Sequence, residues 1–422
     1  MNNNLLEIHR GLALLSAFRD LADHPVLSSL SKLLSQLEKA ERETQGQGEE
    51  SQNLLSAYGA FCAAVYDTGG SLSGAVKRMV LENETACLRT VLRGQQPASA
   101  LLHAARKDLA LLERVAALSP DDFSEAARIA GLSEPLEVLP GWDSSSENLS
   151  DAFFAMLSNP GKTGYGIFYS GRVFRIREDG VLSPVDHRRI LPVSSLYGYE
   201  RERRLVLDNT RALVHGGPSA HVLLYGDAGT GKSTTIKACA AEFFDCGLRL
   251  IELKKNQLHF LPGIAEQLAK SPLRFILFLD DLSFREEDDD FCFLKSLLEG
   301  DVAGGEAENI RVYASSNRRH LIRESFSARS GNDIHRNDTL QESMSLAARF
   351  GLTVTFSKPE KDLYQQIVRS LAREYDIALE ENELLLQAEA FALRAGGRSP
   401  RTARQFIRAL AVSYADPASR TP

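Results

Sequence analysis

The stretch HVLLYGDAGTGKSTTIKACAAEFF, residues 221–244, decides the fold of the chain. It joins an apolar run to a loop, Gly226–Ser233, that reads G-x-x-x-x-G-K-S, and the loop leads into a helix-forming segment. The glycines allow successive backbone N–H groups to point at phosphate oxygens, and the following helix presents its positive end to the same anion. The sequence therefore predicts a phosphate-binding loop between a strand and a helix.

Each position of this loop has an expected task toward ATP. Lys232 supplies a full charge to the β- and γ-phosphates, and the Ser233 hydroxyl is expected to ligate Mg²⁺. The remaining positions are expected to contact the nucleotide. The predicted nucleotide-binding residues of the loop are Gly226, Asp227, Ala228, Gly229, Thr230, Gly231, Lys232, Ser233 and Thr234.

Two later strands end in polar side chains. The apolar run Phe275–Leu279 is followed by Asp280 and Asp281, and a strand over 310–315 is followed by Ser316 and Asn317. Polar groups at the carboxyl ends of parallel strands lie where such sheets bind ligands. We expect Asp280 to hold Mg²⁺ through water and Asp281 to orient or deprotonate the attacking water. Asn317 is expected to contact the γ-phosphate or that water, and the alternative that it only caps a turn stays open.

Short apolar segments alternate with helical segments after about residue 191, which predicts an α/β fold with a parallel sheet. Before that point, the first 140 residues show the three- and four-residue apolar spacing of helices. A small β-hairpin, serving as a spacer, is expected to join these two parts, with strands at Ile167–Tyr169 and Val173–Ile176 and its turn at Ser170-Gly171. Asp179-Gly180 offers a second turn, into Val181-Leu182. The expected strands of the sheet are Val222–Tyr225, Leu248–Leu253, Phe275–Leu279, Ile310–Ser315 and Leu352–Phe356.

The expected domain organisation follows from these changes of pattern. Turn-forming residues at 141–150 mark the first boundary, and the pattern is helical only after residue 358. The predicted parts are a helical N-terminal domain (1–150), a small β-hairpin or linker element (151–190), an ATPase core (191–357), a helical lid (358–415) and a tail (416–422).

The motifs GDAGTGKS, FILFLDDL and VYASSN, taken in order, resemble the Walker A, Walker B and sensor 1 motifs of AAA+ P-loop ATPases. The segment 346–352 (LAARFGL) resembles the arginine-finger segment of the replication-initiator and helicase-loader branch. Phrases such as YGDAGTGKS, DDLSF, SNRRHL and RFGL also resemble a bacterial family known as domain of unknown function 815. The resemblance covers about 196–410. It implies a three-layer αβα core, a small helical lid, and activity in a ring or helical oligomer.

The resemblance also implies roles for particular residues. Arg349 would reach the γ-phosphate of a neighbouring subunit, and Arg401 would be the sensor 2 arginine, with Arg398 and Arg404 as rivals. Tyr197 lies where this class often touches adenine. One departure concerns Asp281, because many AAA+ proteins have glutamate at this position. The shorter side chain makes the rate of hydrolysis less predictable than the binding of ATP.

The overall composition excludes several classes of protein. A net charge of −7 argues against a surface that binds nucleic acid throughout, and the five cysteines form no CxxC pair that would indicate a zinc site or a disulfide framework. The sequence contains neither a signal-peptide pattern nor an uninterrupted apolar run of about 18 residues, so we expect a cytoplasmic protein without a membrane span. We expect no aromatic residues to stack among the arginines between 394 and 408, so nucleic-acid binding has weak support.

Three functions compete at this point. The favoured one is a homo-oligomeric ATPase that assembles through the Arg349 side and remodels or loads an unidentified protein or nucleic acid. The alternative is a slow nucleotide-dependent switch or adaptor that engages a protein partner through residues 1–150. A small-molecule kinase is the third, and the finger-like and lid-like segments count against it, because such a kinase needs no arginine from a neighbour.

Overall fold

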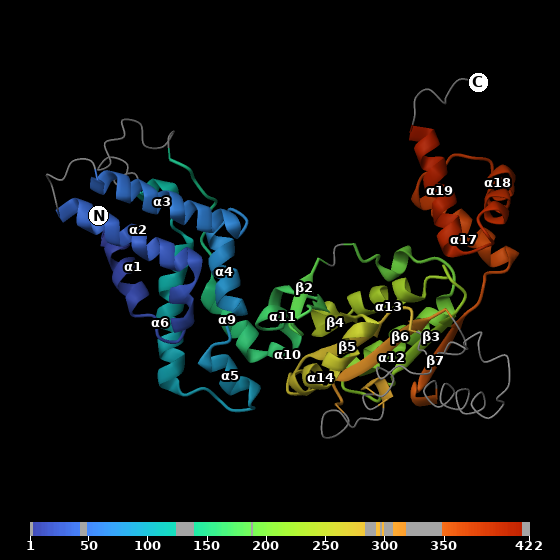
Figure 1. Ribbon diagram of the computed structural model, residues 1–422, viewed down its shortest axis with the longest axis horizontal. Helices are drawn as coiled ribbons and strands as arrows, with labels where there is room; N and C mark the ends of the chain where they lie inside the picture. Colours follow the sequence, from blue (N-terminus) through green and yellow to red (C-terminus); the bar gives the residue numbers. More distant parts are fainter. Residues whose placement is uncertain are drawn as a thin grey trace, which may run out of the picture. The chain divides into compact units, whose positions relative to one another are not determined.

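A computed structural model describes the chain in two compact units, Met1–Ser170 and Gly171–Pro422. Figure 1 shows that the first unit is built of helices and that the second contains the β-sheet. The predicted tail 416–422 lies outside the described residues. The structure describes residues 3–42, 49–123, 139–186, 189–282, 293–295, 298, 307–317 and 348–415.

The described part of the first unit is helical, as the apolar spacing predicts. In the first helix Leu5, Ile8 and Leu12 share one face and are buried. Near the end of the unit the Trp142 indole donates a hydrogen bond to the carbonyl of Leu118. The helices are α1 (Asn3–Ala13), η1 (Arg19–Asp23), α2 (Pro25–Arg42), α3 (Glu49–Asp67), α4 (Leu72–Glu82), α5 (Ala86–Leu92), α6 (Ser99–Ala116), η2 (Pro120–Phe123), α9 (Leu149–Ser158), α10 (Pro160–Thr163) and α11 (Ile167–Ser170).

The second unit is organised around a seven-stranded sheet with the order β2-β1-β4-β5-β6-β3-β7. Every neighbouring pair is parallel except β1 and β2. The five strands predicted from the sequence are confirmed to within one residue. The strands are β1 (Val173–Ile176), β2 (Leu182–Val185), β3 (Val222–Gly226), β4 (Leu248–Leu253), β5 (Arg274–Leu279), β6 (Ile310–Ser316) and β7 (Leu352–Phe356).

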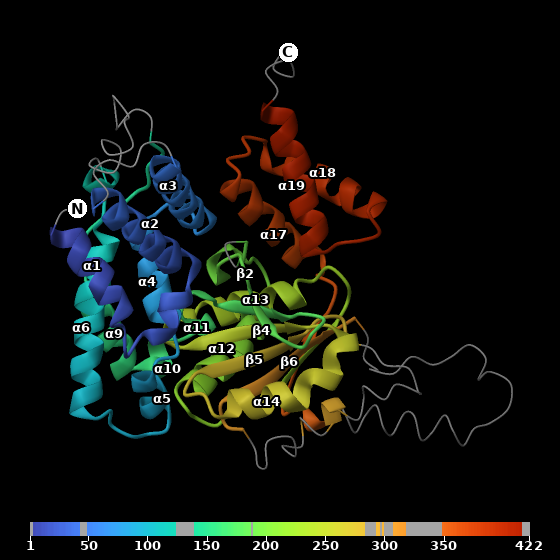
Figure 2. The same cartoon turned by 60° about the vertical axis from the view of Figure 1, so that its left-hand side comes forward.

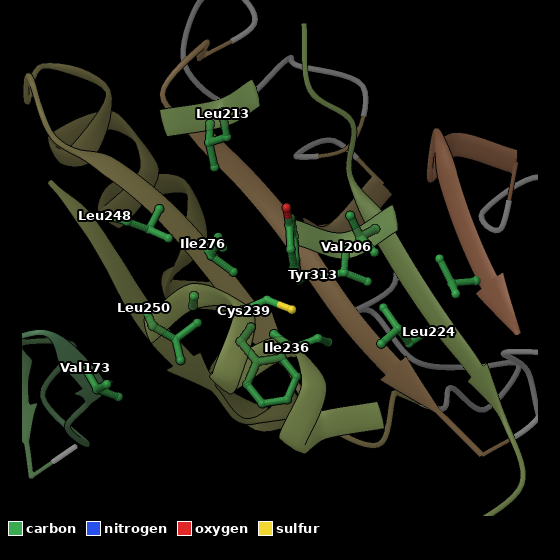
Figure 3. Packing of buried hydrophobic residues seen from close by; sticks show 14 of the residues in the cluster. Val173, Val206, Leu213, Leu224, Ile236, Cys239, Leu248, Leu250, Ile276 and Tyr313 are labelled. Carbon is green, nitrogen blue, oxygen red and sulfur yellow. The ribbon is translucent and has the colours of Figure 1, made fainter. Parts of the chain in front are cut away.

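Helices cover this sheet and bury its side chains. Figure 3 shows Ile236 and Cys239 of one covering helix among side chains of the neighbouring strands. The intervening side chains of β5, such as Leu277, are also buried, which explains why that strand is apolar on both faces. The helices of this part are η3 (Val193–Ser195), α12 (Glu200–Val214), α13 (Lys232–Ala241), η4 (Phe244–Cys246), η5 (Lys255–Phe260) and α14 (Leu261–Ala269).

The predicted hairpin is wrong in its position and in its role. Ile167–Tyr169, expected as its first strand, lies in α11, because this segment packs against α4 and the Phe168 ring contacts that of Tyr165. The observed hairpin joins β1 to β2 one turn later, and β1 pairs in parallel with β4. The hairpin is therefore the edge of the large sheet and does not form a separate element.

A helical subdomain follows the last strand, as the sequence predicts. Figure 2 shows α17 (Lys361–Glu374), α18 (Glu381–Arg394) and α19 (Pro400–Ala415) grouped together. Their apolar faces form a second core, in which Tyr364, Val368 and Ile407 are fully buried. We refer to residues 361–415 as the lid and to residues 357–360, between β7 and α17, as the lid linker. The α/β fold with a helical lid is confirmed.

Candidate nucleotide-binding site

The phosphate loop begins where β3 ends. Gly226 has φ +138°, and a Cβ atom there would lie 2.1 Å from the carbonyl oxygen of Phe356 in β7, so only glycine fits. Gly229 and Gly231 also have positive φ values, of +79° and +97°. The helix α13 begins directly after Gly231, at Lys232. This combination of a glycine loop and a helix N-terminus is the geometry that binds phosphate.

Lys232 is the best-connected side chain of the loop. It is 5% exposed, and its Nζ donates hydrogen bonds to the carbonyls of Gly226 (3.0 Å) and Asp227 (2.8 Å) and to Oδ1 of Asn317 (2.9 Å). Burial lowers the pKa of this amine, while the nearby carboxylates of Asp227 and Asp281 act in the opposite direction. The three acceptors are the kind of partners that phosphate oxygens can replace.

A second group of contacts joins the loop to the end of β5. Ser233 Oγ donates to Oδ1 of Asp280 at 2.5 Å, and Ser315 Oγ donates to the same oxygen at 2.6 Å. The two hydroxyls also lie 3.4 Å apart. Hydroxyl and carboxylate oxygens at one point are the donor set that suits a hard cation such as Mg²⁺. The predicted metal residues Ser233 and Asp280 are therefore brought together and fit the ion.

The strand ends also bring Asp281 and Asn317 together. Oδ1 of Asp281 accepts a hydrogen bond of 2.8 Å from Asn317 Nδ2, and the Asp281 backbone N–H donates to Ser315 Oγ at 3.1 Å. Asp281 has φ +53°, a strained conformation for a residue with a side chain. Since Asn317 also accepts from Lys232, one amide connects the phosphate-binding amine to the carboxylate that we expect to act on water. The role of Asn317 as a simple turn cap has less support from these contacts.

A cavity of about 240 Å³ lies beside the phosphate loop. It is lined from one side by the loop and α13 and from the other by the lid helices. Both Tyr197, the expected base contact, and Arg401, the expected sensor arginine, line it. The lining residues are Leu191, Leu196, Tyr197, Tyr199, Arg203, Gly229, Thr230, Gly231, Thr234, Thr235, Ile367, Leu371, Pro400, Arg401 and Arg404.

The contacts of the three candidate sensor arginines differ. Arg398 forms an ion pair with Glu389 inside the lid, at 2.9 Å, and Arg404 donates to the carbonyl of Ser195 at 3.1 Å. The backbone N–H of Arg401 donates to Gly229 O at 3.2 Å, and its positive charge acts to lower the pKa of Lys232. Arg401 is therefore the arginine whose charge reaches the phosphate loop.

Arg349 lies at the amino ends of the parallel strands, whereas the phosphate loop lies at their carboxyl ends. It comes just before β7, whose first residue Leu352 pairs with Val222, while the phosphate loop follows the paired end at Gly226. A strand of five residues rises about 16 Å, which exceeds the reach of an arginine side chain. Arg349 is thus not brought to the loop of its own chain. Residues 346 and 347 of the same segment lie outside the described residues.

A protein family matches most of the second structural unit of this chain. The family described as "Protein of unknown function (DUF815)" matches residues 170–414, which is more than half of the chain. The chain belongs to the DUF815 family. The predicted resemblance to this family is confirmed, and the match begins one residue before the second structural unit.

The likeness of the chain to other proteins is weaker. No curated protein matches this DUF815 chain. The RuvB Holliday junction branch migration motor of Thermotoga maritima is similar in structure, with 17% identity and a TM-score of 0.37, over 53% of the present chain and 65% of the RuvB chain. A variant of the same RuvB is similar at 17% identity with a TM-score of 0.36. The chain thus covers less than two thirds of these proteins.

Sequence reasoning missed one residue at the centre of the DUF815 site. Ser315 is buried and contacts the side chains of Ser233 and Asp280 and the backbone of Asp281. The signal was present only as a serine two residues before Asn317 at the end of an apolar strand. Among the described residues, no helix is long and apolar enough to cross a membrane.

Proposed function

We propose that this DUF815 protein binds ATP with Mg²⁺ at the carboxyl edge of its sheet and hydrolyses it in a homo-oligomer. The observation that carries the proposal is the connected set of side chains from the loop and two strand ends. Lys232 contacts Asn317, Asn317 contacts Asp281, and Ser233 contacts Asp280. Phosphate, metal and water therefore each have a residue of the expected chemistry within one small site.

The binding part of the proposal assigns the loop to the triphosphate. The backbone amides after Gly226 and the N-terminus of α13 face the phosphates, and Lys232 exchanges its present acceptors for phosphate oxygens. Ser233 and Asp280 would hold Mg²⁺, which, when bound, neutralises charge on the β- and γ-phosphates. The adjoining cavity, with the Tyr197 ring on its wall, receives the base.

The chemical part concerns the attack of water on the γ-phosphorus. A bond forms from the water oxygen to phosphorus, and the bond from phosphorus to the oxygen shared with the β-phosphate breaks, which gives ADP and inorganic phosphate. Asp281 orients the water and accepts its proton, and Asn317 holds the carboxylate in place. Lys232 and Arg401 stabilise the negative charge on the transferred group.

The oligomer is part of the proposal because of the position of Arg349. Its own loop lies about one strand length away, at the other edge of the sheet. A neighbouring chain that presents this edge to the site would add the missing positive charge, and such an arginine contributes on the order of a thousandfold to the rate of related enzymes. The assembly would then remodel or load a protein or nucleic-acid partner.

One observation favours a slow switch as the second candidate. Asp281 has a short side chain, and its carboxylate accepts a hydrogen bond from Asn317. A carboxylate held in this way approaches water less freely than a glutamate would. In this case the protein binds ATP, engages a partner through residues 1–150 and hydrolyses slowly until the partner arrives.

The test is the steady-state release of phosphate from ATP per chain, measured over a wide range of protein concentration. We expect the rate to rise with concentration in the wild type and to fall in both Lys232→Ala and Arg349→Ala. The matched controls are Lys270→Ala and Arg373→Ala, which remove exposed charges away from the site. A rate that is independent of concentration, with tight ATP binding lost only in Lys232→Ala, would favour the switch and contradict the shared site.

A further inference from the structure

The carboxylate of Asp227, the second residue of the phosphate loop, has its partner outside the loop. Its Oδ2 accepts a hydrogen bond of 2.9 Å from the backbone N–H of Lys358, in the lid linker. The Asp227 backbone N–H donates to the carbonyl of Phe356 at 3.0 Å. The side chain and the backbone of Asp227 therefore both bind the segment in which the core ends and the lid begins.

A second residue holds the same linker from the other side. The Tyr199 hydroxyl donates to the carbonyl of Ser357 at 2.6 Å, and its ring lies 5.1 Å from that of Phe356. Tyr199 has φ +58°, a conformation that costs free energy and persists only where the surroundings fix it. The lid linker is thus fixed by residues 357 and 358 to two elements that border the cavity.

The phosphate loop also touches the beginning of α19. The carbonyl of Gly229 accepts from the Arg401 backbone N–H at 3.2 Å, and a Cβ on Gly229 would lie 3.2 Å from Ser399 Oγ. On the lid side, Lys358 Nζ lies 3.8 Å from the position of a Cβ on Gly397. Because the loop and the beginning of α19 are joined by a hydrogen bond and lie in close proximity, a shift of the loop displaces its partner in the lid.

The carbonyl of Asp227 faces the occupant of the loop. It accepts hydrogen bonds from Lys232 Nζ (2.8 Å) and from Thr230 Oγ1 (2.9 Å). A triphosphate that takes Lys232 as a donor removes one of these bonds. The carbonyl of Asp227 therefore contacts the phosphate-binding amine, and the carboxylate of the same residue contacts the lid linker.

We propose that Asp227 is a positioning residue whose carboxylate couples occupancy of the phosphate loop to the position of the lid, and so to the placement of Arg401. The inference rests on the proposed function of the same site. It differs from a simple electrostatic role of the Asp227 charge toward phosphate, because it depends on a hydrogen-bond acceptor at this position rather than on a charge.

Two substitutions separate the acceptor from the charge. Asp227→Asn removes the charge and keeps an oxygen that accepts from Lys358, whereas Asp227→Ala removes both. Asp362→Ala is the control, because this exposed aspartate in the first turn of α17 has the same charge close to the linker. If Asp227→Ala does not fold, Asp227→Leu, which has a similar branched shape and no acceptor, replaces it and carries the same expectation.

The readout is the distance between spin labels on the core and on the lid of the full chain. One label is placed on the exposed Cys246, and the other on Leu393→Cys, whose native side chain is 80% exposed. Cys292→Ser removes a competing thiol. Distance distributions are recorded without nucleotide and with Mg²⁺ and a non-hydrolysable ATP analogue, and binding of a fluorescent ATP analogue is titrated in parallel.

We expect the analogue to shift the distribution in the wild type, in Asp227→Asn and in Asp362→Ala. In Asp227→Ala we expect a broader distribution without nucleotide, no shift with it, and binding about threefold to tenfold weaker than in Asp227→Asn. Equal behaviour of Asp227→Ala and the wild type would overturn the inference, and so would equal behaviour of the two Asp227 variants. Absence of binding in the wild type would instead overturn the proposed function, and this inference with it.

Discussion

Each edge of the central sheet holds a buried cation, Lys232 at the carboxyl edge and Arg311 at the amino edge, but the two cations have different kinds of partners. At the carboxyl edge, Lys232, Asn317 and Asp281 contact one another through side-chain atoms. At the amino edge, the guanidinium of Arg311 donates to the backbone carbonyls of Ser219 (3.0 Å), Ala307 (3.0 Å) and Ile310 (2.7 Å). Lys232 has a side-chain partner, Asn317, beside the carbonyls of its own loop, and a phosphate ligand can take the place of these acceptors. The carbonyls bound by Arg311 belong to strand and turn segments away from the loop, and loss of their donor leaves them unsatisfied. Burial of a charge alone therefore does not distinguish a site from a structural support.

The largest expected effect concerns the carboxyl edge. Lys232→Ala removes the charged amine that donates to Asn317. We expect ATP affinity to fall at least about 100-fold, which corresponds to about 3 kcal/mol. The midpoint of thermal unfolding should change little. Titration of a fluorescent ATP analogue and a thermal scan measure the two quantities, and a large loss of stability with normal binding would reverse the assignment of this edge.

The second effect concerns the amino edge. Arg311→Ala leaves several carbonyls without their donor, and we expect the free energy of unfolding to fall by about 2 kcal/mol. ATP affinity of the remaining folded protein should stay within about twofold, since Arg311 is far along the strand from the loop. Urea unfolding followed by circular dichroism measures the stability of the variant, and an ATP titration measures its affinity. Weaker binding without a change in stability would contradict the comparison.

The third effect is a dependence of stability on pH at the amino edge. Burial lowers the pKa of His221 to about 4, and its neutral Nδ1 accepts a hydrogen bond of 2.9 Å from the Val312 backbone N–H. Between about pH 4 and pH 6.5 the unfolded chain binds more protons at this residue, so stability is complete above pH 6.5 and declines as pH falls. We expect a loss of about 1 kcal/mol from pH 7 to pH 5.5, absent in His221→Asn. If the stability of the wild type and that of His221→Asn depend on pH in the same way, His221 makes no such contribution.

The smallest expected effect concerns Ser315, at the carboxyl edge. Ser315→Ala removes one donor to Asp280 and the acceptor for the Asp281 backbone N–H. We expect the ATPase turnover to fall about fivefold with little change in ATP affinity, because the water-directing carboxylate loses support while Lys232 keeps its contacts. Ser195→Ala, in η3, serves as a control in the same assay. A change confined to affinity would place Ser315 with the binding residues instead.

The sequence predicts the strands more accurately than it predicts the joins between elements. Buried parallel strands are apolar on both faces, so Phe275–Leu279 is visible from the sequence alone, and the polar residues that follow it mark the carboxyl edge. Ile167–Tyr169 has the composition of a strand, but packing of α11 against α4 decides its conformation. Tertiary packing of this kind leaves no local pattern to detect.

The sequence also does not predict which contacts the polar residues Ser315 and Asp227 make. Ser315 reads as an ordinary strand residue, and nothing in GDAGTGKS indicates that the carboxylate of Asp227 holds Lys358, 131 positions away in the chain. Such contacts depend on which strands become neighbours, here β3 and β7. The motif therefore predicts where phosphate binds, but it does not predict how the loop is connected to the lid.

The measurement that tests the shared site most directly is the ATPase rate of a mixture of two inactive variants. Lys232→Ala keeps Arg349 but has a defective loop, and Arg349→Ala keeps the loop but lacks the arginine. We predict that each variant alone is nearly inactive and that an equimolar mixture regains a substantial part of the wild-type rate, because some sites combine an intact loop with an intact arginine from the neighbour. A mixture that is no more active than the two variants measured separately would contradict the account.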